Sequence, residues 1–183
     1  MKMKQMFYFC ALFFLMFGIG MVYEQSEPVF QQVEKAVAAT ASVGAFEGKQ
    51  AVPFTLKDKD GSEISLQSFQ GKRVIVNFFA TWCLPCQEEM PALVKYEQTL
   101  DENTILLGVN LTSQERSKAD VEPFLNHFNA NFEVLYDETG EVMKQYSIFG
   151  IPTTVVINEN GVIEKRINGM VTEEMLEEIG KSK

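Results

Sequence analysis

The sequence predicts an α/β domain whose central mixed sheet is flanked by helices on both faces. Two runs rich in β-branched and apolar residues, 73–79 and 104–111, are typical of strands buried on both sides. The segment 86–100 between them has the apolar spacing of a helix, so the three segments form a β-α-β unit. A β-hairpin is predicted on each side of this unit, at 54–65 and at 155–167.

The chain begins with a basic segment followed by an apolar one. Lys2 and Lys4 precede an uncharged, almost wholly apolar run of 18 residues, 6–23. That length reaches the lower limit for a transmembrane helix. Because of its length we expect 1–23 to be a retained membrane anchor, and the lysines before the run and acidic residues after it predict its orientation. Its N-terminus would lie in the cytoplasm and the domain outside. A cleaved signal peptide is the alternative.

The segment 24–47 shows little periodicity, and we expect it to be a tether leading to a domain over 48–183. The whole chain has 16 Lys and Arg against 25 Asp and Glu, which gives a net charge of -9. So acidic a chain is a poor match for nucleic-acid phosphates, and the sequence has no basic patch. We therefore expect no nucleic-acid partner.

The remaining elements complete the sheet and its helices in chain order. Short strands at 54–56 and 63–65 flank the turn signal Asp60-Gly61, which predicts an added N-terminal β-hairpin. Asn160-Gly161 is the corresponding signal between the last two strands. The other predicted elements are a helix over 117–129, a strand at 132–136, a helix at 141–146 and a terminal helix from Thr172.

The strongest chemical signal is the motif Cys83-Leu84-Pro85-Cys86, which follows a buried strand and opens a helix. Two sulfurs one helical turn apart are close enough to bridge. The unpaired N–H groups and the positive dipole end of the helix favour a thiolate on the first cysteine. We therefore predict that Cys83 is an exposed attacking nucleophile and that Cys86 is the resolving thiol.

A zinc half-site and an inert structural disulfide are two other interpretations of this pair. Zinc takes four ligands, and the only further candidates are Cys10, inside the apolar run, and His127. We interpret His127 as a surface or packing residue. A disulfide that closes so short a loop would stabilise the fold little. We expect redox chemistry at the two cysteines, with no metal and no cofactor.

Three features together resemble the thioredoxin superfamily over residues 48–181. They are Trp82-Cys83-Leu84-Pro85-Cys86, Pro91 five residues after the second cysteine, and Ile151-Pro152-Thr153 before a strand. The anchor, the added hairpin and the residues around the cysteines are similar to those of membrane-anchored ResA/TlpA-type thiol–disulfide oxidoreductases. The resemblance implies a thioredoxin-like fold and a cis peptide bond before Pro152. It also implies contact with substrate through Trp82, Pro85, Ile151 and Pro152.

Asn77 is the one polar residue in the run 74–79, and we interpret it as a hydrogen-bonded core amide. Thioredoxins carry a buried Asp at this position. ResA-like proteins are similar to this chain in having Asn, and they use a Glu three residues after the second cysteine, which here is Glu89. A carboxyl with a raised pKa, next to Cys86 on the helix, could take its proton. A solvated Glu89 on the helix face is the alternative.

The resemblance implies a reductase that acts on protein disulfides outside the membrane. Electrons would come from a membrane thiol reductant of the CcdA type, and the clients would be apocytochrome c or spore-envelope proteins. The chain has no haem-attachment motif of its own, because Gln87 follows Cys86. Oxidation of secreted proteins and a redox-inactive peptide-binding or chaperone role remain alternatives. A thiol peroxidase is disfavoured, because no proline lies in the strand before Cys83.

Overall fold

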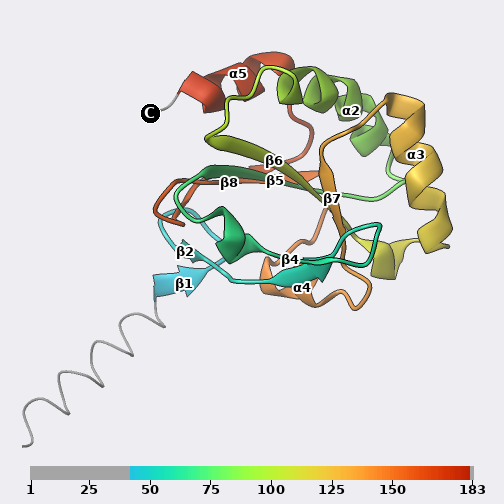
Figure 1. Cartoon of the computed structure of the whole chain (residues 1–183), viewed down its shortest axis with the longest axis horizontal. Helices are drawn as coiled ribbons and strands as arrows, with labels where there is room; N and C mark the ends of the chain where they lie inside the picture. Colours follow the sequence, from blue (N-terminus) through green and yellow to red (C-terminus); the bar gives the residue numbers. More distant parts are fainter. Residues whose placement is uncertain (1–41, 182–183) are drawn as a thin grey trace, which may run out of the picture. The chain divides into compact units, whose positions relative to one another are not determined.

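A seven-stranded sheet forms the centre of the computed structural model, which describes residues 42–181 (Figure 1). In spatial order its strands are β4 (Glu63–Ser65), β3 (Thr55–Lys57), β7 (Glu133–Tyr136), β6 (Thr104–Asn110), β5 (Arg73–Phe79), β8 (Thr153–Ile157) and β9 (Ile163–Asn168). β5, β6 and β7 run parallel to one another. The strands on either side of these three pair antiparallel, so the predicted mixed sheet and both predicted hairpins are confirmed.

Helices cover both faces of the sheet, as predicted (Figure 1). One face packs against α2 (Leu84–Glu97), α3 (Val121–Phe128) and α5 (Glu173–Lys181), and the core on that side includes Met90, Leu125 and Leu176. The other face packs against the short helix α4 (Glu141–Gln145) and the 3-10 turn η1 (Leu66–Phe69). β5 lies inside the sheet between β6 and β8, and all of its residues are buried, which explains its largely apolar sequence.

Two helices begin at least two residues away from their predicted starts. α2 begins at Leu84, two residues before the predicted start, because Cys83 serves as its N-cap and Pro85 is tolerated in the first turn. The predicted helix 117–129 is divided into a 3-10 turn, η3 (Lys118–Asp120), and α3. Asn129 ends α3 in the left-handed conformation, with φ of 55°.

The described part of the folded unit starts at Val43, five residues before the predicted domain boundary at 48. A two-residue strand, β1 (Val43–Gly44), pairs in parallel with β2 (Gln50–Ala51), and Ala45 is buried. So short a pairing leaves no periodicity in the sequence, which is why 43–47 resembled the end of a tether. The rest of the tether and the predicted anchor over 6–23 lie outside the described residues. Within 42–181, no helix is long and apolar enough to span a bilayer.

Candidate active site

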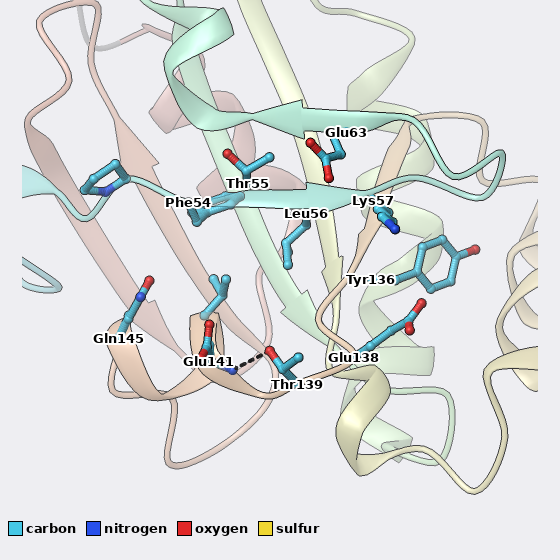
Figure 2. A pocket seen from close by; sticks show the side chains of 12 residues that line it. Phe54, Thr55, Leu56, Lys57, Glu63, Tyr136, Glu138, Thr139, Glu141 and Gln145 are labelled. Atoms are coloured by element: carbon cyan, nitrogen blue, oxygen red, sulfur yellow. Dashed lines mark hydrogen bonds between the residues drawn. The ribbon is translucent and has the colours of Figure 1, made fainter.

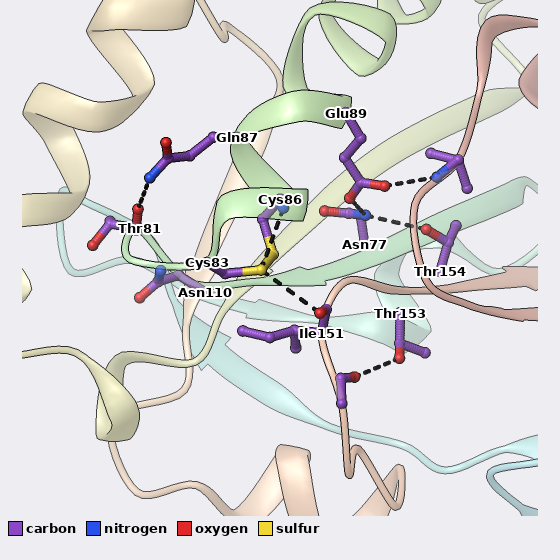
Figure 3. The surroundings of a disulfide bond; sticks show 12 residues. Asn77, Thr81, Cys83, Cys86, Gln87, Glu89, Asn110, Ile151, Thr153 and Thr154 are labelled. Atoms are coloured by element: carbon purple, nitrogen blue, oxygen red, sulfur yellow. Dashed lines mark hydrogen bonds between the residues drawn. A yellow bond between two sulfur atoms is a disulfide. The ribbon is translucent and has the colours of Figure 1, made fainter.

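Cys83 and Cys86 form a disulfide at the point where β5 leads into α2 (Figure 3). Their Cα atoms are 5.2 Å apart. Cys83 is the N-cap of α2, and the backbone N–H of Cys86 donates a hydrogen bond of 3.3 Å to its sulfur. A donor in this position stabilises negative charge on Cys83 when the disulfide is opened. The local geometry therefore distinguishes the two sulfurs, as the sequence predicted.

The expected exposure of Cys83 is wrong for the disulfide form. The residue is only 4% exposed, and Cys86 is fully buried. The loop before β8 lies against Cys83, with the carbonyl oxygen of Ile151 3.6 Å from its sulfur (Figure 3). The Cys83 sulfur is therefore largely covered in the disulfide form.

The peptide bond between Ile151 and Pro152 is cis, as the resemblance implied. Two hydrogen bonds hold the loop around it. The N–H of Gly169 donates to the carbonyl of Pro152 at 2.8 Å, and the hydroxyl of Thr153 donates to the carbonyl of Gly150 at 2.8 Å. The loop held in this way contacts Cys83 through Ile151, so residues 83 and 151–152, which are far apart in the sequence, lie next to each other.

Glu89 lies in α2 one turn after Cys86, and it is buried. The alternative of a solvated helix-face carboxylate is wrong, since the residue is 2% exposed whereas its neighbour Glu88 is exposed. The N–H of Val171 donates to one carboxyl oxygen at 2.8 Å. The side-chain amide of Asn77 donates to the other at 2.7 Å. Burial raises the pKa of Glu89 to about 7, and the two hydrogen bonds oppose that rise.

Asn77 is a hydrogen-bonded core amide, which confirms its interpretation. It lies opposite Thr154 in the pairing of β5 with β8, and its Nδ2 donates to the hydroxyl of Thr154 at 3.1 Å as well as to Glu89. Its Oδ1 has no hydrogen-bond partner among the described residues. Asn77, Thr154 and Glu89 therefore form a buried polar chain behind the disulfide (Figure 3).

The raised pKa of Glu89 predicts that stability depends on pH. The carboxyl ionises near pH 4.5 in the unfolded chain and near pH 7 in the fold, so the folded state holds the extra proton between these values. This contribution is full below pH 4.5, is lost progressively as the pH rises toward 7, and is gone above the folded-state pKa. We expect a loss of about 3 kcal/mol between pH 5 and pH 8 from this group in the oxidised protein. Urea unfolding at both pH values should show this loss in the wild type and in the exposed control Glu88→Gln. An equal loss in Glu89→Gln would contradict the assignment.

Glu115, which the sequence analysis did not single out, holds the residues that precede the dithiol. It lies just after β6 and accepts hydrogen bonds from the N–H and the hydroxyl of Thr81, at 2.7 and 2.6 Å. Asn110, the last residue of β6, donates to it at 2.9 Å. The predicted β-α-β unit could have indicated this role. It makes β5 and β6 parallel neighbours, whose carboxyl ends lie at the same edge of the sheet, and Glu115 follows the end of β6. Glu115 thus fixes the start of the active-site turn.

Trp82 and Pro85, the other predicted substrate-binding residues, lie on either side of Cys83 at the surface. Trp82 is 54% exposed, and its indole N–H donates to the carbonyl of Gln114 at 3.0 Å. Pro85 is exposed in the first turn of α2. Both residues are therefore accessible from solvent beside the disulfide.

Other features of the described residues do not form a competing centre. The exposed His127 packs against Phe128, in keeping with a surface or packing residue. No group of three or more His, Cys, Asp or Glu side chains within 42–181 could hold a metal ion. A cavity of about 470 Å³ lies between β3 and α4, lined in part by Lys57, Glu63 and Glu141 (Figure 2). Neither cysteine lines it, so we place the chemistry at the disulfide.

Comparisons with known proteins agree with this geometry. The family model described as the AhpC/TSA family matches residues 48–166. The thioredoxin-like protein YneN of Bacillus subtilis is 38% identical over 74% of this chain and 79% of its own. The thiol–disulfide oxidoreductase ResA of Halalkalibacterium halodurans is 37% identical over 72% of this chain and 73% of its own.

Among solved structures, the crystal structure of StoA from Bacillus subtilis is similar, with a TM-score of 0.65 and 34% identity. The similarity covers 71% of this chain and 97% of that chain. With the mixed sheet and its flanking helices, it shows a thioredoxin-like fold. The chain belongs to the AhpC/TSA family of thioredoxin-like proteins, and with its Cys83–Cys86 pair it is a thiol–disulfide oxidoreductase of the ResA/StoA type.

Proposed function

We propose that this enzyme reduces disulfides of client proteins on the outer side of a membrane. The observation that carries the proposal is the placement of Cys83. It is the N-cap of α2, receives the N–H of Cys86 and faces the cis-proline loop through Ile151. This placement stabilises a thiolate beside a loop that an extended client chain can approach.

The reaction runs in two exchange steps. In the reduced enzyme the Cys83 thiolate attacks one sulfur of the client disulfide, so that a Cys83–client bond forms and the client's own bond breaks. The departing client sulfur takes a proton from solvent. Cys86 then gives its proton to a base and attacks the Cys83 sulfur, which releases the second client sulfur as a thiolate that also takes a proton from solvent. The client gains two electrons and two protons, and the enzyme is left with its disulfide.

Glu89 is the acceptor of the Cys86 proton in this scheme. A carboxyl whose pKa is about 7 is near the operating pH, which suits a general base. Asn77 and the N–H of Val171 hold the ionised form, and Thr154 orients the Asn77 amide. When a reductant reopens the disulfide, the proton returns from Glu89 to Cys86.

The predicted anchor over 6–23 places this chemistry at the membrane with the N-terminus in the cytoplasm. An oxidising exterior does not re-reduce the pair, so electrons come from a membrane thiol reductant of the CcdA type. The clients are apocytochrome c, whose cysteines must be reduced before haem attachment, or spore-envelope proteins. The similarity to ResA of Halalkalibacterium halodurans supports a protein-disulfide substrate.

Trapping the mixed disulfide tests client and direction together. Cys86→Ala attacks but cannot resolve, so we expect its client to remain attached through Cys83 in native membranes, with turnover reduced by at least about 1000-fold. Cys83→Ala is the matched control and should trap nothing. Recovery of apocytochrome c supports the reductase.

Other outcomes of the trap distinguish the alternatives. Recovery of many secreted proteins, whose disulfides then fail to form in cells, indicates an oxidase. The absence of any adduct, together with full function of the Cys83→Ala/Cys86→Ala protein, indicates a redox-inactive binding module.

A further inference from the structure

Several large apolar side chains are exposed near the dithiol and near the cis-proline loop. Apart from Val43, the exposed large hydrophobic residues of the described chain are Phe46, Trp82, Leu84, Phe149 and Met170. Trp82 and Leu84 flank Cys83, and Met170 precedes Val171, whose N–H binds Glu89. Phe46 and Phe149 lie on the other side of the cis-proline loop, where they line a common cavity. This concentration indicates a contact surface.

We propose that the cavity between Phe46 and Phe149 is a specificity pocket, which receives an aromatic side chain of the client near its disulfide cysteine. The proposal rests on the function proposed above and adds a class of client sequence. The cavity has a volume of about 430 Å³, and Ile151 and Pro152 form its boundary with the active site. A large ring fits a space of this size.

The pocket is open and apolar where an incoming side chain would enter. Phe149 is 95% exposed and Phe46 is 57% exposed, so both rings offer free faces. Gly150 and Gly169 also line the cavity, and a Cβ added to either would meet no atom within 4 Å. Burial of two partly free rings against a third apolar group is favourable, and this favours an aromatic occupant over a polar one.

Arg166 also lines the pocket and adds a second attraction for an aromatic ring. Its guanidinium donates to the carbonyls of Ala45, Tyr146 and Ser147 at 2.9 to 3.1 Å. Its centre lies 5.3 Å from the ring of Phe46. It makes no ion pair with a carboxylate of the described residues. Its hydrogen bonds to carbonyls hold the guanidinium beside Phe46, so an aromatic ring that enters the pocket would lie close to a cation.

The position of the pocket limits which client residue can enter it. Ile151 lines the cavity, and its carbonyl oxygen is 3.6 Å from the Cys83 sulfur that carries the client. An extended chain advances about 3.3 Å per residue. The occupant therefore lies within about three residues of the client cysteine, on the side that crosses the cis-proline loop.

The test measures reduction of paired peptide disulfides by the reduced full chain in lipid nanodiscs. One peptide carries Phe two residues from its cysteine, and the other carries Ala there. Cystine serves as a small disulfide without a flanking chain. Trp82, the single tryptophan, lies beside Cys83 and reports oxidation by its fluorescence. We expect the wild type to reduce the Phe peptide about tenfold faster than the Ala peptide, as expected for burial of one aromatic ring.

The double variant Phe46→Ser/Phe149→Ser should lose this preference while reducing cystine at the wild-type rate. Both rings are exposed, so the fold should tolerate the change. Val43→Ser, an exposed apolar residue that does not line the cavity, is the matched control and should keep the preference.

Equal rates for the two peptides in the wild type would overturn the pocket while leaving the reductase intact. The pocket is also wrong if the double variant keeps the peptide preference but loses self-association in sedimentation or binding to lipid vesicles. In that case a second copy of the chain or a membrane covers the rings. Failure of the wild type to reduce even cystine would instead count against the proposed function.

Discussion

Replacing Glu89 by Gln should slow resolution of the mixed disulfide about 100-fold at pH 7, because loss of a positioned general base typically costs that much or more. The first attack by Cys83 should keep its rate, since its thiolate is held by the N–H of Cys86 and the helix dipole. Gln fits the same buried space and can still accept the hydrogen bond from Val171. The change therefore removes the proton acceptor and retains the packing.

Single-turnover kinetics separate the two steps. The wild-type resolution rate should rise between pH 6 and pH 8 with the ionisation of Glu89, whose pKa is about 7. The rate for Glu89→Gln should show no inflection there. Glu88→Gln, on the exposed side of the same helix turn, should behave as the wild type. Equal resolution rates in Glu89→Gln and the wild type would remove Glu89 from the mechanism.

The core of the fold could be predicted from the sequence because its signals are local. β5 is mostly apolar because both of its faces are covered, and α2 begins with Cys83 as its N-cap and Pro85 in its first turn. The turn signals at Gly61 and Gly161 predicted the hairpins, and both glycines have positive φ. Each of these features can be recognised within about ten residues of chain.

The site was less predictable because its geometry depends on residues far apart in the chain. The burial of Glu89 depends on Val171 and Asn77, and nothing next to it in the sequence separates it from the exposed Glu88. The burial of Cys83 depends on the loop that contains Ile151. Sequence periodicity describes one face of one element, whereas these contacts join three or four elements.

The pocket between Phe46 and Phe149 could not be predicted either, because it too joins segments that are far apart in the sequence. Phe46 lies in the segment predicted as the end of the tether, 43–47, and Phe149 lies in a loop. Arg166 of β9 brings the two segments together by binding carbonyls of Ala45 and of Tyr146 and Ser147. An Arg in a strand normally indicates a face exposed to solvent. The position of Arg166 in the sequence therefore did not predict that it would bind these carbonyls.

Asn77→Asp should destabilise the oxidised protein by at least about 3 kcal/mol at pH 8 and much less at pH 5. The Asn77 amide now donates to Glu89 at 2.7 Å, and an Asp would place a second carboxyl against the first. Two buried carboxyls in contact share one proton at low pH, whereas removal of the last proton is strongly opposed. The stability of this variant should therefore fall more steeply above pH 7 than that of the wild type.

Adding Glu89→Gln to Asn77→Asp should restore most of the stability lost at pH 8. In the double variant the introduced glutamine can donate its amide to the introduced aspartate, and its carbonyl oxygen can still accept from Val171. The Thr154 hydroxyl, now 3.1 Å from the Asn77 amide, can turn to donate as well. Urea unfolding of the wild type, both single variants and the double variant gives a coupling free energy between the two positions. A coupling near zero at pH 8 would mean that the two positions act independently, and a proton shared between the two acids would then be ruled out.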